Sequence, residues 1–105
     1  MQISELSELF SALSNEKRLY VFLIIMELEP VCVCDIIKIT ELPQSSVSRA
    51  LSYLRLSGLV ISNRDGARVC YSIDRTNPAV PPLLDFLKSL HIPKLKDIRN
   101  FKKSC

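Results

Sequence analysis

The hydrophobic residues in the first half of the chain recur every three or four positions, which is the spacing of amphipathic helices. Ser14 or Asn15 is placed to cap the second helix, and Pro30 ends it because proline cannot continue a helix. Gly58 stands where a left-handed C-terminal cap is expected for the fourth. The pattern predicts helices over residues 3–13, 16–28, 33–39 and 44–56.

The pattern changes after Gly58. Residues 59–63 and 68–73 are rich in β-branched and aromatic side chains, and Asp65-Gly66 between them is a signal for a two-residue hairpin turn. A proline-rich linker then leads to a last helix over residues 83–90. This helix is so apolar that we expect it to pack against its counterpart in a second subunit.

Two short helices joined by a tight turn, with a β-hairpin after the second, are typical of a winged helix-turn-helix. The predicted fold is therefore mainly α with a small β-hairpin, assembled as a homodimer. We expect residues 1–92 to form the DNA-binding and dimerisation domain, and residues 93–105 to form a basic tail that carries Cys105.

Charge and hydropathy add little to this picture. Fourteen Lys and Arg against eleven Asp and Glu give a net charge of +3, which is compatible with a nucleic-acid partner but does not establish one. Neither a signal peptide nor a membrane-spanning run is apparent, so we expect a cytoplasmic protein with no membrane partner.

The polar face of the helix over residues 44–56 carries small hydroxyls and one guanidinium. Short side chains permit close approach to a duplex, and Arg49 can grip a guanine with two hydrogen bonds or pair with a phosphate. Each residue alone also fits an ordinary solvated face, and the combination is what favours double-stranded DNA as the partner. The predicted DNA-binding residues are Gln44, Ser45, Ser46, Ser48, Arg49, Ser52, Arg64 and Arg68.

From Leu9 to Asp74 the sequence resembles the arsenic-repressor (ArsR/SmtB) family of metal-sensing repressors. The segments that carry the resemblance are LFSALSNEKRL, PVCVCDI, LPQSSVSRALSYLRLSGLV and DGARVCYSI. The resemblance implies a dimer held by the first and last helices, which binds an inverted-repeat operator and leaves it when a ligand binds. Pro43, Ala50 and Cys70 depart from the family pattern.

The four cysteines suggest the sensing chemistry. Nothing signals secretion, so we expect free thiols rather than disulfides. Cys32 and Cys34 stand where a helix begins, and its free N–H groups favour thiolates that bind soft ions. The predicted inducer is As(III) or Sb(III), with other soft metal ions as alternatives. The family's arsenic site takes its third sulfur one turn later, where this chain has Ile37, so Cys105 is the preferred third ligand and Cys70 the second choice.

The cysteines also allow other functions. The first alternative is a repressor of the same fold that responds to oxidants or persulfides through its thiols. A thiol enzyme lacks a histidine near the C-x-C pair, and a structural zinc site usually pairs C-x-x-C motifs. The family's other metal site would need a histidine at position 87 together with Asp85, but this chain has Leu87, so we expect no zinc site there. We also predict that the protein is not an enzyme.

Overall fold

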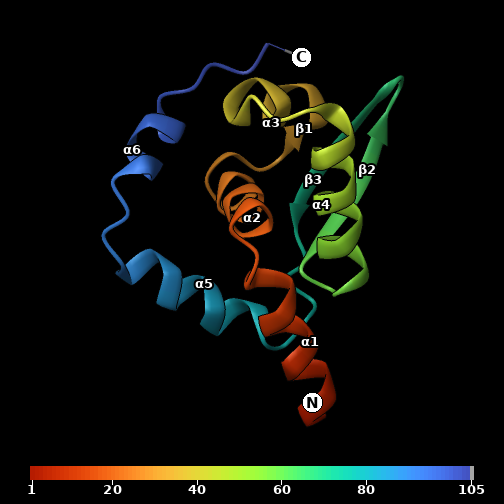
Figure 1. Cartoon of the computed structure of the whole chain (residues 1–105), viewed down its shortest axis with the longest axis vertical. Helices are drawn as coiled ribbons and strands as arrows, with labels where there is room; N and C mark the ends of the chain where they lie inside the picture. The colour runs from red at the N-terminus through yellow and green to blue at the C-terminus, as the bar shows by residue number, and fades with distance from the viewer. Residues whose placement is uncertain (105) are drawn as a thin grey trace.

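The computed structural model describes residues 1–104 and has a mainly helical fold with a small antiparallel sheet (Figure 1). This confirms the predicted winged helix-turn-helix. Strand β1 and helix α6 were not predicted. The elements are α1 (Ile3–Leu13), α2 (Glu16–Leu28), β1 (Val31–Cys32), α3 (Val33–Thr40), α4 (Gln44–Leu56), β2 (Val60–Asp65), β3 (Arg68–Ile73), α5 (Val80–Ser89) and α6 (Lys94–Arg99).

Helix α2 is the centre of the core. Its residues from Val21 to Met26 are all buried, because α1, α3, α4, α6 and β3 pack around it. A helix that is apolar on every side needs such an enclosed position. In Figure 1, α5 and α6 lie on one side of α2 and the hairpin β2–β3 lies on the other.

The predicted helix ends are confirmed at the caps of α2 and α4, and α2 ends at Leu28, before Pro30, as predicted. The backbone N–H of Arg18 donates to Asn15 Oδ1 at 3.1 Å, so Asn15 is the N-cap of α2. Gly58 has φ +77° and follows α4, and the N–H of Leu59 donates to the carbonyl of Leu54 at 3.0 Å. These two caps fix where the chain enters α2 and leaves the helix-turn-helix.

The hairpin β2–β3, called the wing below, differs from the prediction by one residue. Asp65 pairs with Arg68, so the two-residue loop is Gly66-Ala67 rather than Asp65-Gly66. Gly66 has φ +63°, the conformation that a type II′ turn requires at its first central position.

Strand β1 adds a third strand to the sheet, in the order β1-β3-β2. Val31 lies opposite Tyr71, and Cys32 lies opposite Cys70. Two residues are too few to show an alternating pattern, so no periodicity in the sequence indicated this strand.

Part of the segment expected to be a basic tail is helix α6. Its Leu95 and Ile98 are buried against α2, and Arg99 Nε donates to Glu27 Oε2 at 2.9 Å. The lysines around these two apolar residues hid their helical spacing. Cys105 lies outside the described residues.

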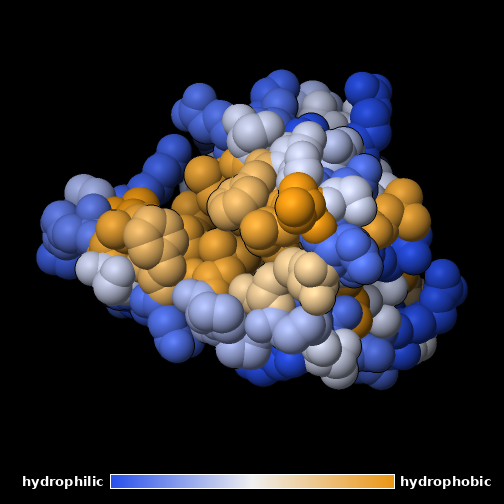
Figure 2. Space-filling view, turned by 90° about the horizontal axis from the view of Figure 1, so that it is seen from below, coloured by the Kyte–Doolittle hydropathy of each residue, from blue (hydrophilic) through white to orange (hydrophobic). Residues whose placement is uncertain are grey.

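Helices α1 and α5 leave an apolar face uncovered. They lie at the lower end of the molecule in Figure 1, and Figure 2 shows a broad hydrophobic area on that end. We call the exposed apolar side chains of these two helices the α1–α5 face; they are Ile3, Leu6, Phe10, Phe86 and Leu90. Monomeric proteins rarely expose patches of this kind.

None of the helices within residues 1–104 has the length and apolar character needed to cross a membrane.

Candidate nucleic-acid interface and thiol site

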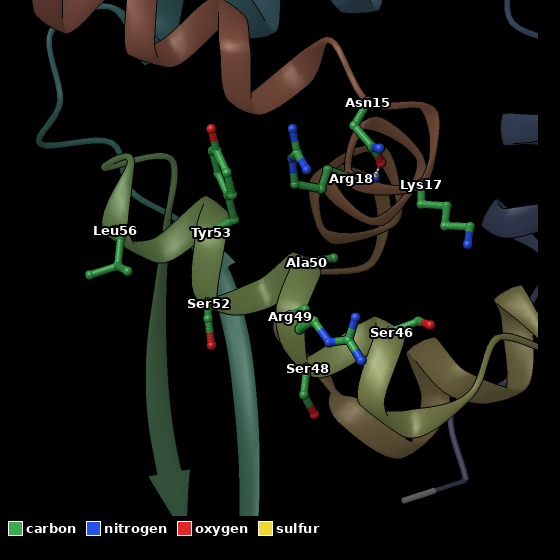
Figure 3. Close-up of a pocket in the computed structure, with 10 residues that line it drawn as sticks. All are labelled: Asn15, Lys17, Arg18, Ser46, Ser48, Arg49, Ala50, Ser52, Tyr53 and Leu56. Atoms are coloured by element: carbon green, nitrogen blue, oxygen red, sulfur yellow. Dashed lines mark hydrogen bonds between the residues drawn. The ribbon is translucent and has the colours of Figure 1, made fainter.

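A groove runs between α4 and the start of α2, and Figure 3 shows the side chains that line it. Four of the predicted DNA-binding residues meet there, and α2 contributes residues that were not predicted. We call it the α2–α4 groove; its lining is Asn15, Lys17, Arg18, Ser46, Ser48, Arg49, Ala50, Ser52, Tyr53 and Leu56.

Lys17 is the main addition to the predicted interface. It is exposed on the first turn of α2 and lines the groove together with Arg49, which is also exposed. Two cations on one groove suit a polyanion, and the N-terminal end of a helix favours negative charge as well. The run Asn-Glu-Lys-Arg at residues 15–18 was the available signal, but only the packing of α2 on α4 brings Lys17 into the same groove as Arg49.

Arg18 has a different role, because its guanidinium is held by the protein. Its Nε donates to the carbonyl of Ala12 at 2.9 Å, and its Nη2 donates to that of Ser11 at 3.1 Å. Its guanidinium carbon lies 4.0 Å from the centre of the Tyr53 ring, and the two side chains stand side by side in Figure 3. Arg18 thus joins the end of α1 to α4.

A second hollow lies at the start of α3, between the wing and α4, and Cys32 and Cys34 line it. We call it the thiol hollow. Three predicted DNA-binding residues, Gln44, Ser48 and Arg68, line the same hollow. Its full lining is Cys32, Val33, Cys34, Ile37, Gln44, Ser48, Ala67, Arg68, Val69 and Tyr71.

The other predicted DNA contacts lie outside both hollows. Ser45 is exposed on the first turn of α4, and Arg64 is exposed on β2 near the tip of the wing. Arg68 Nη2 lies 3.2 Å from Asp65 Oδ2 in an exposed ion pair at the same tip. Arg64 and Arg68 therefore place positive charge on the wing, as predicted.

The prediction of free thiols is wrong for Cys32 and Cys70, which form a disulfide. The cause is the pairing of β1 with β3, which sets these residues directly opposite each other with their Cα atoms 4.0 Å apart. Opposed residues on neighbouring strands point to the same face of the sheet, so the two sulfurs meet.

Among residues 1–104, the predicted metal ligands do not form a metal site in this oxidised form. Within residues 1–104, no group of three or more His, Cys, Asp or Glu side chains is arranged to hold a metal ion. A disulfide sulfur has no thiolate charge to offer, and Cys32 is paired in that way. After reduction, the sulfur donors of the thiol site suit soft ions such as As(III) or Cd(II).

Asp35 is a buried carboxylate at this site that the sequence did not single out. Its Oδ1 accepts a hydrogen bond from the backbone N–H of Ser104 at 3.1 Å, and its Oδ2 has no hydrogen-bond partner among the described residues. Lys103 Nζ also donates to the carbonyl of Pro30 at 2.9 Å. These contacts hold residues 103 and 104 beside the start of α3.

Glu29 ties the end of α2 to the end of the sheet. Its two carboxylate oxygens accept hydrogen bonds from Arg75 Nη1 and Nη2 at 2.7 and 2.6 Å, and Oε1 also accepts from the N–H of Ile73 at 3.1 Å. The Arg75 hydrogen bonds are the main cause that lowers the pKa of Glu29, against the opposing effect of burial. This contact braces β3 close to the thiol site.

These features define a winged helix-turn-helix protein with a basic groove along α4, the second helix of the helix-turn-helix. Residues 15–62 match the sequence profile of the bacterial regulatory proteins of the arsR family. The arsenical resistance operon repressor of Escherichia coli strain K12 is 38% identical over 74 residues, which are 70% of this chain and 61% of that protein. The HTH-type transcriptional regulator YgaV of the same strain is 33% identical over 85 residues, 81% of this chain and 84% of YgaV.

Among solved structures, HlyU from Vibrio cholerae N16961 superimposes with a TM-score of 0.75 at 27% identity, covering 87% of this chain and 98% of HlyU. The chain belongs to the arsR family of bacterial regulatory proteins. It spans about three fifths of the length of the arsenical repressor that it matches.

Proposed function

We propose that the protein is a homodimeric transcriptional repressor that binds double-stranded DNA and releases it when As(III) or Sb(III) binds its cysteine thiolates. The observation that carries the proposal is the thiol hollow, because Cys32 and Cys34 share it with Gln44, Ser48 and Arg68. A change at the sulfur atoms therefore acts directly on side chains proposed to face DNA. The resemblance to arsenical repressors supports the choice of ligand.

The DNA-binding half of the proposal rests on the α2–α4 groove and the wing. Ser48 and Ser52 point to the same side of α4 in Figure 3, and Arg49 and Lys17 supply charge beside them. Pairing two subunits through the α1–α5 face would present two copies of α4 to an inverted-repeat operator. Half-sites about one helical turn apart, roughly 34 Å, fit such a dimer.

The sensing half depends on the position of α3, which precedes the reading helix. A thiophilic ion bound by two or three cysteine sulfurs would bring those sulfurs closer together. Cys32 is the N-cap of α3 and Cys34 lies in its first turn, so movement of these residues shifts the start of α3. The third sulfur would come from Cys70 or from Cys105, and the contact of Ser104 with Asp35 supports Cys105 as a candidate.

An operator-release assay tests the proposal. Reduced protein on a fluorescent operator is titrated with arsenite, antimonite, Cd(II) and Zn(II), and release is followed by anisotropy. We expect arsenite or antimonite to release the wild type, while Cys32→Ser and Cys34→Ser bind the operator normally and stay bound. Loss of DNA binding in either variant without inducer would indicate a structural role instead.

One observation favours a second function for the same fold, a redox-responsive repressor. Cys32 and Cys70 are joined in the described structure, and the relative HlyU has also been solved in a reduced form. In this alternative, a peroxide or a persulfide changes DNA affinity with no metalloid present. Release by oxidant from the wild type, combined with no response to arsenite, would replace the first proposal by this one.

A further inference from the structure

A hollow separate from the thiol site lies between the start of α2, the turn that joins α3 to α4, and the start of α6. Its volume is about 650 Å³, which is within the range of small-molecule sites in proteins. We call it the α2–α6 hollow; its lining includes Lys17, Leu19, Tyr20, Leu42, Ile92 and Lys94.

We propose that the α2–α6 hollow binds a small amphipathic anion, a carboxylate attached to an apolar body of medium size, and that this binding weakens the affinity of the protein for DNA. The first half of the inference depends only on the hollow. The second half rests on the proposed function, because it requires a protein that binds an operator. Neither half involves the cysteines.

The walls of the hollow are apolar and only partly covered. Leu19, Tyr20, Leu42 and Ile92 pack against the hydrophobic core, yet each remains partly exposed where it lines the hollow. Three separate segments of the chain thus present apolar surface to one space. Removal of such surface from water is favourable, so a ligand with an apolar body would bind by filling that space.

Two lysines determine the charge of the ligand. Lys94 is the first residue of α6, and its Nζ lies 4.6 Å from the centre of the Tyr20 ring, so its ammonium group is held over an apolar wall. Lys17 lines the same hollow, and Glu16 is the acidic residue among those described in the lining. Two positive charges therefore face one negative charge, and an ammonium group donates strong hydrogen bonds to a carboxylate.

The position of Lys17 connects this hollow to the proposed DNA interface. Lys17 and Asn15 line both the α2–α4 groove and the α2–α6 hollow. In Figure 3 the side chain of Lys17 extends away from Arg18 and Tyr53. An anion in the hollow would pair with the same ammonium group that we propose for a DNA phosphate. The ligand and the DNA would therefore compete for Lys17.

A second contact acts on the helix-turn-helix itself. Thr40 ends α3, Leu42 lies in the turn before α4, and both line the hollow. The backbone N–H of Leu42 donates to Thr40 Oγ1 at 3.2 Å, and the Thr40 hydroxyl donates to the carbonyl of Ile36 at 2.8 Å. A ligand body packed against Leu42 would change the packing of this turn, which sets the position of α4 relative to α3. Both contacts predict a lower affinity for DNA.

Calorimetry with decanoate tests the site. The full-length protein is titrated with decanoate below the concentration at which micelles form, and then with decanol and decylammonium, which have the same chain with no charge and with the opposite charge. We expect decanoate to bind more tightly than either. Lys94→Met removes the charge but keeps most of the side chain, so it should bind decanoate about threefold to tenfold more weakly, with decanol binding unchanged. Lys94→Arg should restore the affinity, and Lys96→Met, at an exposed position on α6 that does not line the hollow, is the matched control.

Operator binding supplies the second readout. Decanoate should lower the operator affinity of the wild type, measured by anisotropy, by at least about fivefold. It should also reduce the slope of the salt dependence by about one for each Lys17 that it takes from a phosphate. Lys94→Met should bind the operator normally and respond less to decanoate.

Three results would overturn the inference: equal affinities for decanoate and decanol, unchanged decanoate affinity in Lys94→Met, or an operator affinity that decanoate does not alter. Absence of operator binding without decanoate would overturn the proposed function instead. Calorimetry alone would then decide whether the hollow binds an anion.

Discussion

Replacing Arg49 by alanine removes a guanidinium from the α2–α4 groove at little cost to the fold. Arg49 is exposed, and no hydrogen bond or ion pair to it is found within residues 1–104. Surface substitutions of this kind change the free energy of unfolding by about 0.5 kcal/mol or less. Any larger effect on operator binding therefore reports a contact with DNA.

The expected size of that effect follows from the proposed dimer. One bidentate contact between arginine and guanine discriminates by about 1–3 kcal/mol. A symmetric dimer makes the contact twice, so Arg49→Ala should weaken operator binding by about 2–6 kcal/mol. With 1.4 kcal/mol for each factor of ten, the affinity falls by about 30-fold to more than about 10⁴-fold, which leaves little specific binding.

Fluorescence anisotropy with operator and with scrambled DNA, repeated over a salt series, measures this decrease. Arg55→Ala is the matched control, because Arg55 is exposed on the same helix but does not line the groove. Arg49→Lys keeps the charge and should still lose specificity. If Arg49 pairs with phosphate instead, both DNAs should weaken equally, and the slope of the salt dependence should fall by about one for each phosphate that the variant no longer neutralises. Unchanged operator affinity in Arg49→Ala would refute the placement of the reading face.

Two further predictions concern assembly and pH. The double variant Phe10→Asp, Phe86→Asp places charge on the α1–α5 face and should be a monomer in sedimentation experiments. The control Ile61→Asp, at an exposed apolar position on the wing, should leave the proposed dimer intact. A dimer in the double variant would contradict this interface. Glu29→Gln should cost about 1 kcal/mol of unfolding free energy at pH 7, because Arg75 no longer has a charged partner there. The folded pKa of Glu29 lies below 4.5, so its contribution is complete above that pH and disappears as the pH falls through the folded value. Urea unfolding of both proteins over a pH series from 7 downward should show a difference that is full at pH 7 and decreases in acid, and a difference that does not change with pH would exclude the ionised pair as its cause.

Local signals predicted most of the fold. The spacing of apolar residues located α1 to α5, although α5 begins at Val80, with prolines in its first turn, and not at residue 83 as predicted. Asn15 and Gly58 marked helix boundaries because each satisfies a backbone requirement at its own position. The exposed face of α4, which we propose to contact DNA, followed from the same periodicity, since Val47, Leu51 and Leu54 are buried in the core and Ser48 and Arg49 are exposed.

Non-local packing accounts for what was missed. Strand β1 has two residues and exists only because β3 lies beside it, so the Cys32–Cys70 pairing was not visible in the order of residues. Lys17 joined the site only through the packing of α2 on α4. Helix α6 was obscured because lysines flank Leu95, and only burial against α2 reveals its role.

In the proposed dimer, the two contacts of Arg18 have a consequence for which operators the protein would bind. Arg18 connects the last turn of α1, which is part of the proposed subunit interface, to Tyr53 near the C-terminal end of α4. Such a fixed connection would leave the two α4 helices of the proposed dimer little freedom to adjust their separation. An operator whose half-sites are one base pair closer or farther apart would present the correct bases in the wrong rotational position. The protein would then bind that operator weakly.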